Sequence, residues 1–183
     1  MLRFLDVVLA AIGLIVAAPV MLILLVLGFF DTGAPIFTQV RVGRHQQPFT
    51  LVKFRTLRQG TESVATHLLD PATVTPLGAV MRRTKLDELP QLWNVLKGEM
   101  SMVGPRPCLF SQQELIQVRA ARGVFRARPG ITGLAQVQGI DMSAPELLAD
   151  TDARMLESLG VAAYLGYLVK TLTGSGYGDR MRG

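Results

Sequence analysis

The sequence has few of the residues that usually build disulfides or transition-metal sites. Among its 183 residues there are one cysteine and two histidines. The lone Cys108 excludes an intramolecular disulfide, and His45 and His67 are isolated, without the spacing of metal ligands. Aromatic residues make up 7% of the chain and are not interleaved with Lys and Arg clusters. The net charge of +5 therefore points to anionic headgroups or phosphorylated ligands rather than to nucleic acid.

Charge is also absent from a long segment near the N-terminus. Residues 7–30 carry no charged side chain, and about 20 apolar residues are enough to cross a bilayer as a helix. A signal peptide, the competing interpretation, would have a shorter apolar core of about 7–15 residues and a small-residue cleavage site. The sequence therefore predicts a membrane helix here.

Pro19 lies near the middle of this apolar segment. A proline inside a helix removes one backbone hydrogen bond and kinks the helix. Basic residues favour the cytoplasmic side of a membrane, and they flank the segment on both sides. These residues are Arg3, Arg41, Arg44, Lys53 and Arg55. We expect residues 1–32 to form a re-entrant helix-break-helix hairpin with both ends in the cytoplasm, and a straight span is the alternative.

The rest of the chain, residues 33–172, is expected to form one small, mostly helical α+β domain. The segments PIFTQVRVG and QPFTLVKFRTL are rich in Thr, Val, Ile and Phe, which indicates a short β-hairpin. Residues 161–172 are amphipathic and could lie on a membrane surface as an interfacial helix. Residues 173–183 are expected to be a mobile tail. Apolar spacing predicts further helices over 77–86, 87–98, 111–122 and 144–158.

Two adjacent carboxylates, Asp87 and Glu88, head the apolar stretch LDELPQLWNVLKG. Pro90 is tolerated only in the first turn of a helix, so this helix is predicted to start near Asp87. A helix N-terminus offers unpaired N–H groups and a partial positive charge, which stabilise ionised carboxylates. The pair could simply cap the helix, because acidic caps are common. Trp93 is expected to pack in the core.

Arginines surround the acid pair in the sequence: Arg82, Arg83, Arg106 and Arg128. Two of them lie in the proline-stiffened loops GPRP and RPG, and arginine is suited to bidentate recognition of phosphate. Carboxylates, fixed arginines and backbone amides together would suit a diphosphate with bound Mg²⁺. An ionised aspartate can also attack phosphorus directly. These residue types therefore point to phosphoryl chemistry at the acid pair.

The stretch RRTKLDELPQLWNVLKGEMSMVGPRP, followed by RPGITGLAQVQG, resembles the bacterial sugar transferase family. This family consists of small monotopic phosphoglycosyl transferases that act on polyprenyl phosphate. The N-terminal apolar segment and IFTQVRVG…FTLVKFRTL match as well, so the resemblance covers residues 1 to about 172. It implies transfer of a sugar 1-phosphate from a UDP-sugar to undecaprenyl phosphate with release of UMP. In bacteria this is the first membrane step of surface polysaccharide, O-antigen, exopolysaccharide or glycoprotein assembly.

The resemblance also implies roles for individual residues. Asp87 would be the nucleophile that carries a covalent phosphosugar, Glu88 its partner carboxylate, and both would bind Mg²⁺. Three positions depart from the family pattern: Ala18 replaces a frequent Ser before the helix proline, Glu99 replaces a frequent Asp, and Ile140 replaces a frequent arginine. The last departure predicts that the choice of sugar can differ from that of other members. The implied substrate-binding residues are Lys53, Arg82, Arg106, Arg128, Pro129, Gly130 and Asp152.

The implied location is the bacterial inner membrane, with the catalytic domain on the cytoplasmic face. The implied partners are a UDP-sugar, undecaprenyl phosphate and membrane lipids, and a homodimer through the membrane region is left open. An N-acetylated amino sugar is the expected donor type, with glucose or galactose as alternatives. Two other functions fit the same residues. One is a membrane-bound Mg²⁺-dependent phosphatase or pyrophosphatase with water as acceptor, and the other is a non-enzymatic membrane adaptor whose acid pair only caps a helix.

Overall fold

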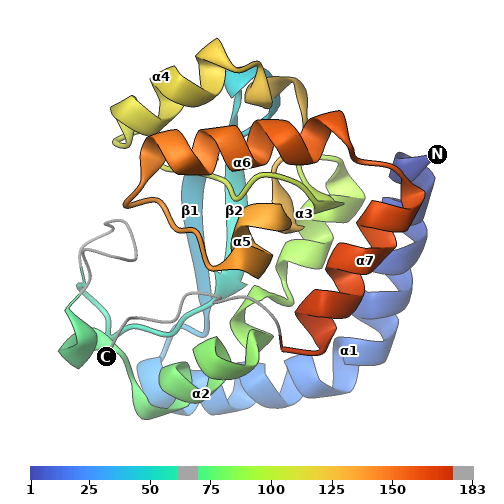
Figure 1. Ribbon diagram of the computed structural model, residues 1–183. Helices are drawn as coiled ribbons and strands as arrows, with labels where there is room; N and C mark the ends of the chain where they lie inside the picture. The colour runs from blue at the N-terminus through green and yellow to red at the C-terminus, as the bar shows by residue number, and fades with distance from the viewer. Residues whose placement is uncertain (62–69, 175–183) are drawn as a thin grey trace.

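The computed structural model describes residues 1–61 and 70–174, and it begins with one long helix. This helix, α1 (Leu2–Thr32), contains Pro19 in its interior. Its ribbon changes direction part of the way along, so the first half descends along one side of the molecule and the second half passes beside α2 (Pro76–Thr84) (Figure 1). The bend is the distortion that a proline inside a helix predicts.

Only one stripe of α1 is buried against the rest of the protein. Its buried residues, spaced as one helical face requires, are Asp6, Ala10, Leu24 and Gly28. By length and composition alone the helix could cross a membrane, and 11% of its most apolar window is buried inside the protein. An apolar surface of this extent marks a region that lipid or another protein covers. The exposed apolar residues include Ile12, Ile15, Val16, Leu22, Ile23, Phe29 and Phe30.

The predicted β-hairpin is confirmed and lies next to the helix that follows the acid pair. Strands β1 (Ile36–Val42) and β2 (Pro48–Phe54) pair in antiparallel register. The helix α3 (Gln91–Lys97) packs between β2 and α1. Asn94 fixes it to the hairpin, because its side-chain N–H donates to the Thr50 carbonyl at 2.7 Å and its oxygen accepts from the Val52 N–H at 3.1 Å. The apolar core here contains Ala10, Phe49, Leu51, Leu92, Val95 and Met100.

The start of α3 differs from the expectation. Residues Leu86–Glu88 form a 3-10 turn, η4, and the α-helix begins only at Gln91, directly after Pro90. Trp93, expected in the core, is 54% exposed. The prediction was wrong because Leu92 and Val95 occupy the face that packs against α1 and the hairpin.

Two segments expected to be loops contain regular structure. The three-residue strands β3 (Ser101–Val103) and β4 (Gly130–Thr132) pair in parallel, and a short helix, α5 (Leu134–Gln138), follows β4. The other helices lie close to the expected ranges: α4 (Gln113–Ala121), α6 (Pro145–Glu157) and α7 (Val161–Leu172). Short 3-10 turns complete the described chain: η1 (Arg44–Gln46), η3 (Pro71–Thr73) and η5 (Val124–Arg126). The fold is therefore a mostly helical α+β arrangement with two small sheets.

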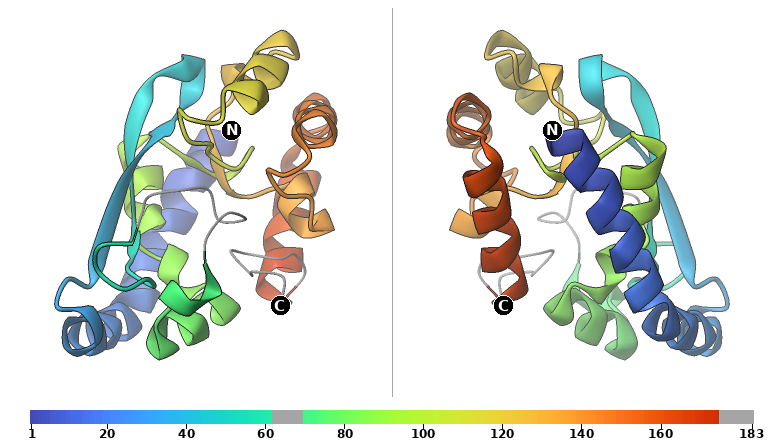
Figure 2. Two further views of the ribbon diagram at one scale, coloured as in Figure 1. Left: turned by 90° about the vertical axis from the view of Figure 1, so that its left-hand side faces the viewer. Right: turned by 90° about the vertical axis from the view of Figure 1, so that its right-hand side faces the viewer.

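The elements lie in two groups. Figure 2 shows the hairpin, α1 and α3 at one side of the molecule and α6 and α7 at the other. The loops that contain GPRP and RPG connect the two groups through the β3–β4 pair. From residue 175 onward, the segment expected to be a mobile tail lies outside the described residues.

Candidate active site

The acid pair lies in η4, between α2 and α3. Asp87 is 1% exposed and Glu88 is 7% exposed, so both carboxylates are largely removed from water. Burying a charge without a partner is costly, and such groups are normally paired or bound to metal. Glu88 meets this requirement through Arg106, whose Nη2 donates to its Oε1 at 2.9 Å. The GPRP loop therefore supplies a guanidinium directly at the acid pair.

Arg82 supplies a second guanidinium from the last turn of α2, which contacts η4. Its Nε donates to the Thr56 hydroxyl at 2.9 Å, while its Nη1 is buried and has no hydrogen-bond partner among the described residues. Gly78 permits this packing, because a Cβ atom there would lie 2.2 Å from the Thr56 carbonyl oxygen. A buried cationic nitrogen with no protein acceptor is suited to an anionic ligand.

The GPRP and RPG loops are in direct backbone contact. The Gly130 N–H donates to the Pro105 carbonyl at 2.9 Å. A Cβ atom on Gly130 would lie 2.0 Å from the Gly104 nitrogen, so only glycine fits at this crossing. The two residues implied to lie near the uridine, Pro129 and Gly130, therefore brace the loop that carries Arg106.

Asp152 lies inside α6 and is fully buried. Its Oδ2 accepts hydrogen bonds from Arg119 Nη2 at 2.6 Å and from Arg119 Nε at 3.0 Å. Burial raises the pKa of Asp152, and the charge of Arg119 opposes this rise. Arg119 also donates from Nη1 to the Arg106 carbonyl at 2.8 Å. Direct contact between Asp152 and substrate is therefore not what the structure shows, because this carboxylate reaches the site only through Arg119 and the backbone of Arg106.

Arg128 lies at the opposite end of α3 from the acid pair. Its Nε donates to the Gly98 carbonyl at 2.8 Å, at the C-terminal end of that helix. Burial lowers the pKa of Arg128, and the positive charges of Arg3 and Arg44 nearby lower it further. The structure thus gives Arg128 a contact with the end of the helix, and its role in phosphate binding stays a prediction.

Lys53 lies on β2, the strand that contacts η4. Its Nζ is 5.8 Å from the centroid of the Phe37 ring, and the Arg55 guanidinium is 5.3 Å from the same centroid. Cations near an aromatic face are stabilised by the ring quadrupole. The elements in contact around η4 therefore carry four of the expected residues, Asp87, Glu88, Arg82 and Lys53, and the GPRP loop adds Arg106.

The donor set at η4 fits Mg²⁺. This ion prefers oxygen ligands and is usually held by one or two carboxylates together with substrate phosphates and water. Asp87 and Glu88 would provide the carboxylates. Over residues 1–61 and 70–174, no three His, Cys, Asp or Glu side chains gather closely enough to hold an ion by themselves. The remaining ligands would therefore come from a bound diphosphate and from water.

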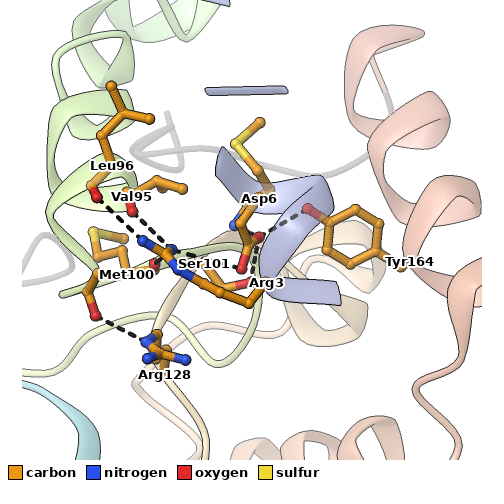
Figure 3. Close-up of polar contacts among 10 residues, drawn as sticks. Arg3, Asp6, Val95, Leu96, Met100, Ser101, Arg128 and Tyr164 are labelled. Atoms are coloured by element: carbon orange, nitrogen blue, oxygen red, sulfur yellow. Dashed lines mark hydrogen bonds and ion pairs between the residues drawn. The ribbon is translucent and has the colours of Figure 1, made fainter. Parts of the chain in front are cut away.

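A buried polar cluster around Asp6 was not predicted. The Asp6 Oδ1 accepts hydrogen bonds from the Ser101 hydroxyl, the Met102 N–H and the Tyr164 hydroxyl, each at 2.8 Å (Figure 3). One signal was available in the sequence, since Asp6 is a lone acidic residue directly before the uncharged segment. Its partners are distant in sequence and carry no local signal of their own.

Comparisons with known proteins identify the family of the chain. The family described as "Bacterial sugar transferase" matches residues 1–175. The exopolysaccharide production protein ExoY of Rhizobium meliloti is 35% identical over 189 residues, which cover 93% of this chain and 83% of ExoY. The UDP-glucose:undecaprenyl-phosphate glucose-1-phosphate transferase of Caulobacter vibrioides is 41% identical over 145 residues, which cover 75% of this chain and 54% of that protein.

Some relatives are much longer than this chain. An uncharacterized sugar transferase of Haemophilus influenzae is 39% identical over 154 residues, which cover 75% of this chain but 32% of that protein. The chain therefore spans about a third of the Haemophilus relative and about half of the Caulobacter one. The match to the family nevertheless extends over almost the whole of this sequence, and the chain belongs to the bacterial sugar transferase family.

Proposed function

We propose that this protein is a membrane-bound phosphoglycosyl transferase that moves a sugar 1-phosphate from a UDP-sugar to undecaprenyl phosphate. Family membership and the names of the relatives support the reaction class. The structural observation that supports the proposal for this chain is the arrangement at η4. There Asp87 and Glu88 are adjacent and buried, and Arg106 forms an ion pair with Glu88. An anionic nucleophile next to a carboxylate that holds a guanidinium group is suited to attack on a diphosphate.

In the first step, a carboxylate oxygen of Asp87 attacks the β-phosphorus of the UDP-sugar. The bond from this phosphorus to the bridging oxygen breaks, UMP leaves with that oxygen, and the sugar phosphate remains on Asp87 as an acyl phosphate. Arg106 and Arg82 stabilise the negative charge on the phosphoryl oxygens. Glu88 orients Arg106 through the ion pair of 2.9 Å.

In the second step, a phosphate oxygen of undecaprenyl phosphate attacks the same phosphorus. The bond to Asp87 breaks, its carboxylate is regenerated, and the lipid carries the sugar through a diphosphate. Both steps bring one anion to another, so positive charge has to be placed around the reacting phosphorus. Mg²⁺ held by Asp87, Glu88 and the substrate phosphates would supply part of that charge.

Helices α1 and α7 support a membrane geometry for this reaction. The apolar helix α1 fits membrane attachment, and α7 exposes Leu165, Val169 and Leu172. The end of α1 is fixed to the domain, because the Thr75 hydroxyl at the start of α2 donates to Asp31 Oδ2 at 2.6 Å. We place the bent helix in the inner membrane as a re-entrant element, with the domain on the cytoplasmic face. The acid pair would then lie near the lipid headgroups, where the acceptor phosphate is found.

The test is UMP release by the purified protein in nanodiscs with Mg²⁺, undecaprenyl phosphate and a panel of UDP-sugars. The panel includes glucose, galactose and N-acetylated amino sugars. Asp87→Asn is expected to lower turnover by about 10³-fold or more, because an amide is not a nucleophile toward phosphorus. Asp150→Asn is the matched control, since Asp150 is exposed on α6 and pairs only with Arg122 among the described residues. Removal of Mg²⁺ with EDTA is expected to stop turnover and its return to restore it.

The acyl phosphate can be detected directly. Without the lipid acceptor, the wild type is expected to release about one equivalent of UMP and to gain the mass of one sugar phosphate on the peptide that contains Asp87. Continued turnover without lipid would instead indicate a hydrolase that uses water. Membrane binding without UMP release from any donor would favour a non-enzymatic adaptor, and full activity of Asp87→Asn would contradict the proposed nucleophile.

A further inference from the structure

Two arginines from distant segments hold the C-terminal end of α3. Arg3 on α1 donates from Nη1 to the Val95 carbonyl at 2.8 Å and from Nη2 to the Leu96 carbonyl at 3.1 Å. Arg128 donates to the Gly98 carbonyl at 2.8 Å (Figure 3). The last carbonyls of a helix have no partner within the helix and carry a partial negative charge, so guanidinium groups stabilise them.

Asp6 fixes Arg3, and with it the first turns of α1, to the rest of the domain. Its Oδ2 is 3.9 Å from Arg3 Nη1. Its Oδ1 binds donors from β3 and from Tyr164 on α7. Burial raises the pKa of Tyr164, and the hydrogen bond and charge of Asp6 raise it further, so the phenol stays protonated and donates. The beginning of α1 is therefore joined to α3 through Arg3, and to β3 and α7 through Asp6.

The orientation of α3 depends on such contacts because the helix is short. Its 7 residues correspond to about 10 Å of length, and an isolated helix of this size is not stable in water. Asn94 attaches its side to β2, while Arg3 and Arg128 attach its C-terminal end. The acid pair lies at the other end, so a tilt of α3 at the arginines would displace the carboxylates relative to the loop of Arg106.

We propose that Arg3 and Asp6 are positioning residues for the reaction. By holding the C-terminal end of α3, they make the placement of Asp87 and Glu88 depend on the docking of α1 against the domain. This inference rests on the proposed function. Neither residue touches the acid pair, so both act through α3, and a protein whose α1 is not docked should bind UDP-sugar without turning it over.

The kinetic test compares Arg3→Ala and Arg3→Lys with the wild type in nanodiscs. Arg3→Ala is expected to lower kcat for UMP release by about 10- to 100-fold, since a displacement of about 1 Å can cost that much. KM and the directly measured Kd for UDP-sugar should change by less than about threefold, because the arginines at the acid pair remain. Arg3→Lys should have a kcat between those of Arg3→Ala and the wild type, since it keeps the charge but lacks the guanidinium that donates to two carbonyls.

Two control variants separate positioning from general stability. Arg122→Ala removes an exposed arginine that pairs with Glu146 and Asp150, and it should keep the wild-type kcat. Leu115→Ala opens a cavity in the core beside α4, so it should lower the melting temperature while kcat, measured well below that temperature, stays unchanged.

Trp93 provides a readout that does not depend on turnover. It is the only tryptophan in the chain, it lies on α3, and it is 54% exposed. Arg3→Ala and Asp6→Asn are expected to change the quenching of Trp93 fluorescence by acrylamide by about twofold, because the C-terminal end of α3 is no longer fixed to α1. The two control variants should leave Trp93 unchanged.

The outcomes are distinct. The inference is overturned if Arg3→Ala keeps wild-type kcat, if only KM rises, or if its loss of activity merely parallels a loss of stability as large as that of Leu115→Ala. It is also overturned if Trp93 responds equally in the control variants. If the wild type releases no UMP from any donor, the proposed function fails and the positioning role fails with it, whereas the fluorescence arm still reports whether Arg3 holds α3.

Discussion

Two ion pairs of similar length differ in what surrounds them. In the Glu88–Arg106 pair, at 2.9 Å, the arginine side chain is 27% exposed and the glutamate 8%. In the Asp152–Arg119 pair, at 2.6 Å, the corresponding values are 0% for the aspartate and 2% for the arginine. A partly exposed guanidinium can bind a ligand while it keeps its protein partner. A fully buried pair can contact a ligand only if the protein opens around it.

One hydrogen bond connects the two pairs, because Arg119 donates to the Arg106 carbonyl at 2.8 Å. The buried pair therefore supports the backbone of the loop that presents the exposed pair. The comparison shows that a carboxylate on a helix near a catalytic loop is not by that fact a substrate ligand. Its burial and its partner determine whether it acts on the substrate or on the protein around it.

Breaking the exposed pair should have the largest effect on catalysis. Arg106→Gln is expected to lower turnover by about 10²- to 10³-fold, because it removes a fixed cation from the reacting phosphates. The melting temperature should fall only slightly, since a partly exposed pair adds little stability. The measurements are kcat for UMP release and thermal unfolding in nanodiscs, with Arg122→Gln as the control. A large loss of stability with normal turnover would reverse the roles of the two pairs.

Breaking the buried pair should act first on stability. Asp152→Asn leaves the Arg119 charge buried without its counter-ion, which typically costs about 3–5 kcal/mol. For a chain of this size, that loss corresponds to a melting temperature lower by roughly 6–20 °C. Thermal unfolding of the variant and the wild type at one pH checks the prediction. An unchanged melting temperature together with a raised KM would instead indicate that Asp152 binds substrate.

A double variant separates the two functions of the buried pair. Arg119→Met with Asp152→Leu replaces both charges by apolar side chains, so most of the lost stability should return. The Arg106 carbonyl would still lack its donor, so turnover should stay below that of the wild type. Recovery of both quantities together would show that the hydrogen bond from Arg119 does not position the loop.

A substitution at the contact between the GPRP and RPG loops should have a smaller effect on the loop that carries Arg106. Gly130→Ala would place a Cβ atom 2.0 Å from the Gly104 nitrogen, so the backbone has to separate. Such overpacking typically costs about 1–3 kcal/mol, and turnover should fall because the Arg106 loop moves. Gly160→Ala is the matched control, since no atom lies within 4 Å of the new Cβ. Equal melting temperatures for the two variants would contradict this close approach.

Much of the fold could be predicted because the relevant patterns are local. The apolar run indicated α1, the β-branched residues indicated the hairpin, and amphipathic spacing gave Val161–Leu172 for α7. The three-residue strands β3 and β4 could not be predicted, since so short a segment shows no periodicity. Helix α5 lies in the same Gly- and Pro-rich sequence and was missed for the same reason.

The residues of the candidate site also divide into those that local sequence patterns could identify and those that they could not. Asp87 and Glu88 are adjacent in sequence, and prolines flank Arg106, so local reasoning could find them. The positions of Arg128 and Asp152 depend on the end of α3 and on Arg119, which only the tertiary structure brings near. A resemblance between motifs identifies such residues as shared, but it does not distinguish contact with substrate from support of the backbone.

The Asp6 cluster also has a consequence for biosynthesis. The residues joined by its hydrogen bond to Tyr164 are 158 positions apart in the chain. At a synthesis rate of 5–20 residues per second, Asp6 leaves the ribosome roughly 8–30 s before its partner does. Until Ser101 and Met102 have been made, its carboxylate has to stay hydrated, because an unpaired charge is costly to bury. The support that Arg3 receives through Asp6 is therefore complete only after α7 has been made.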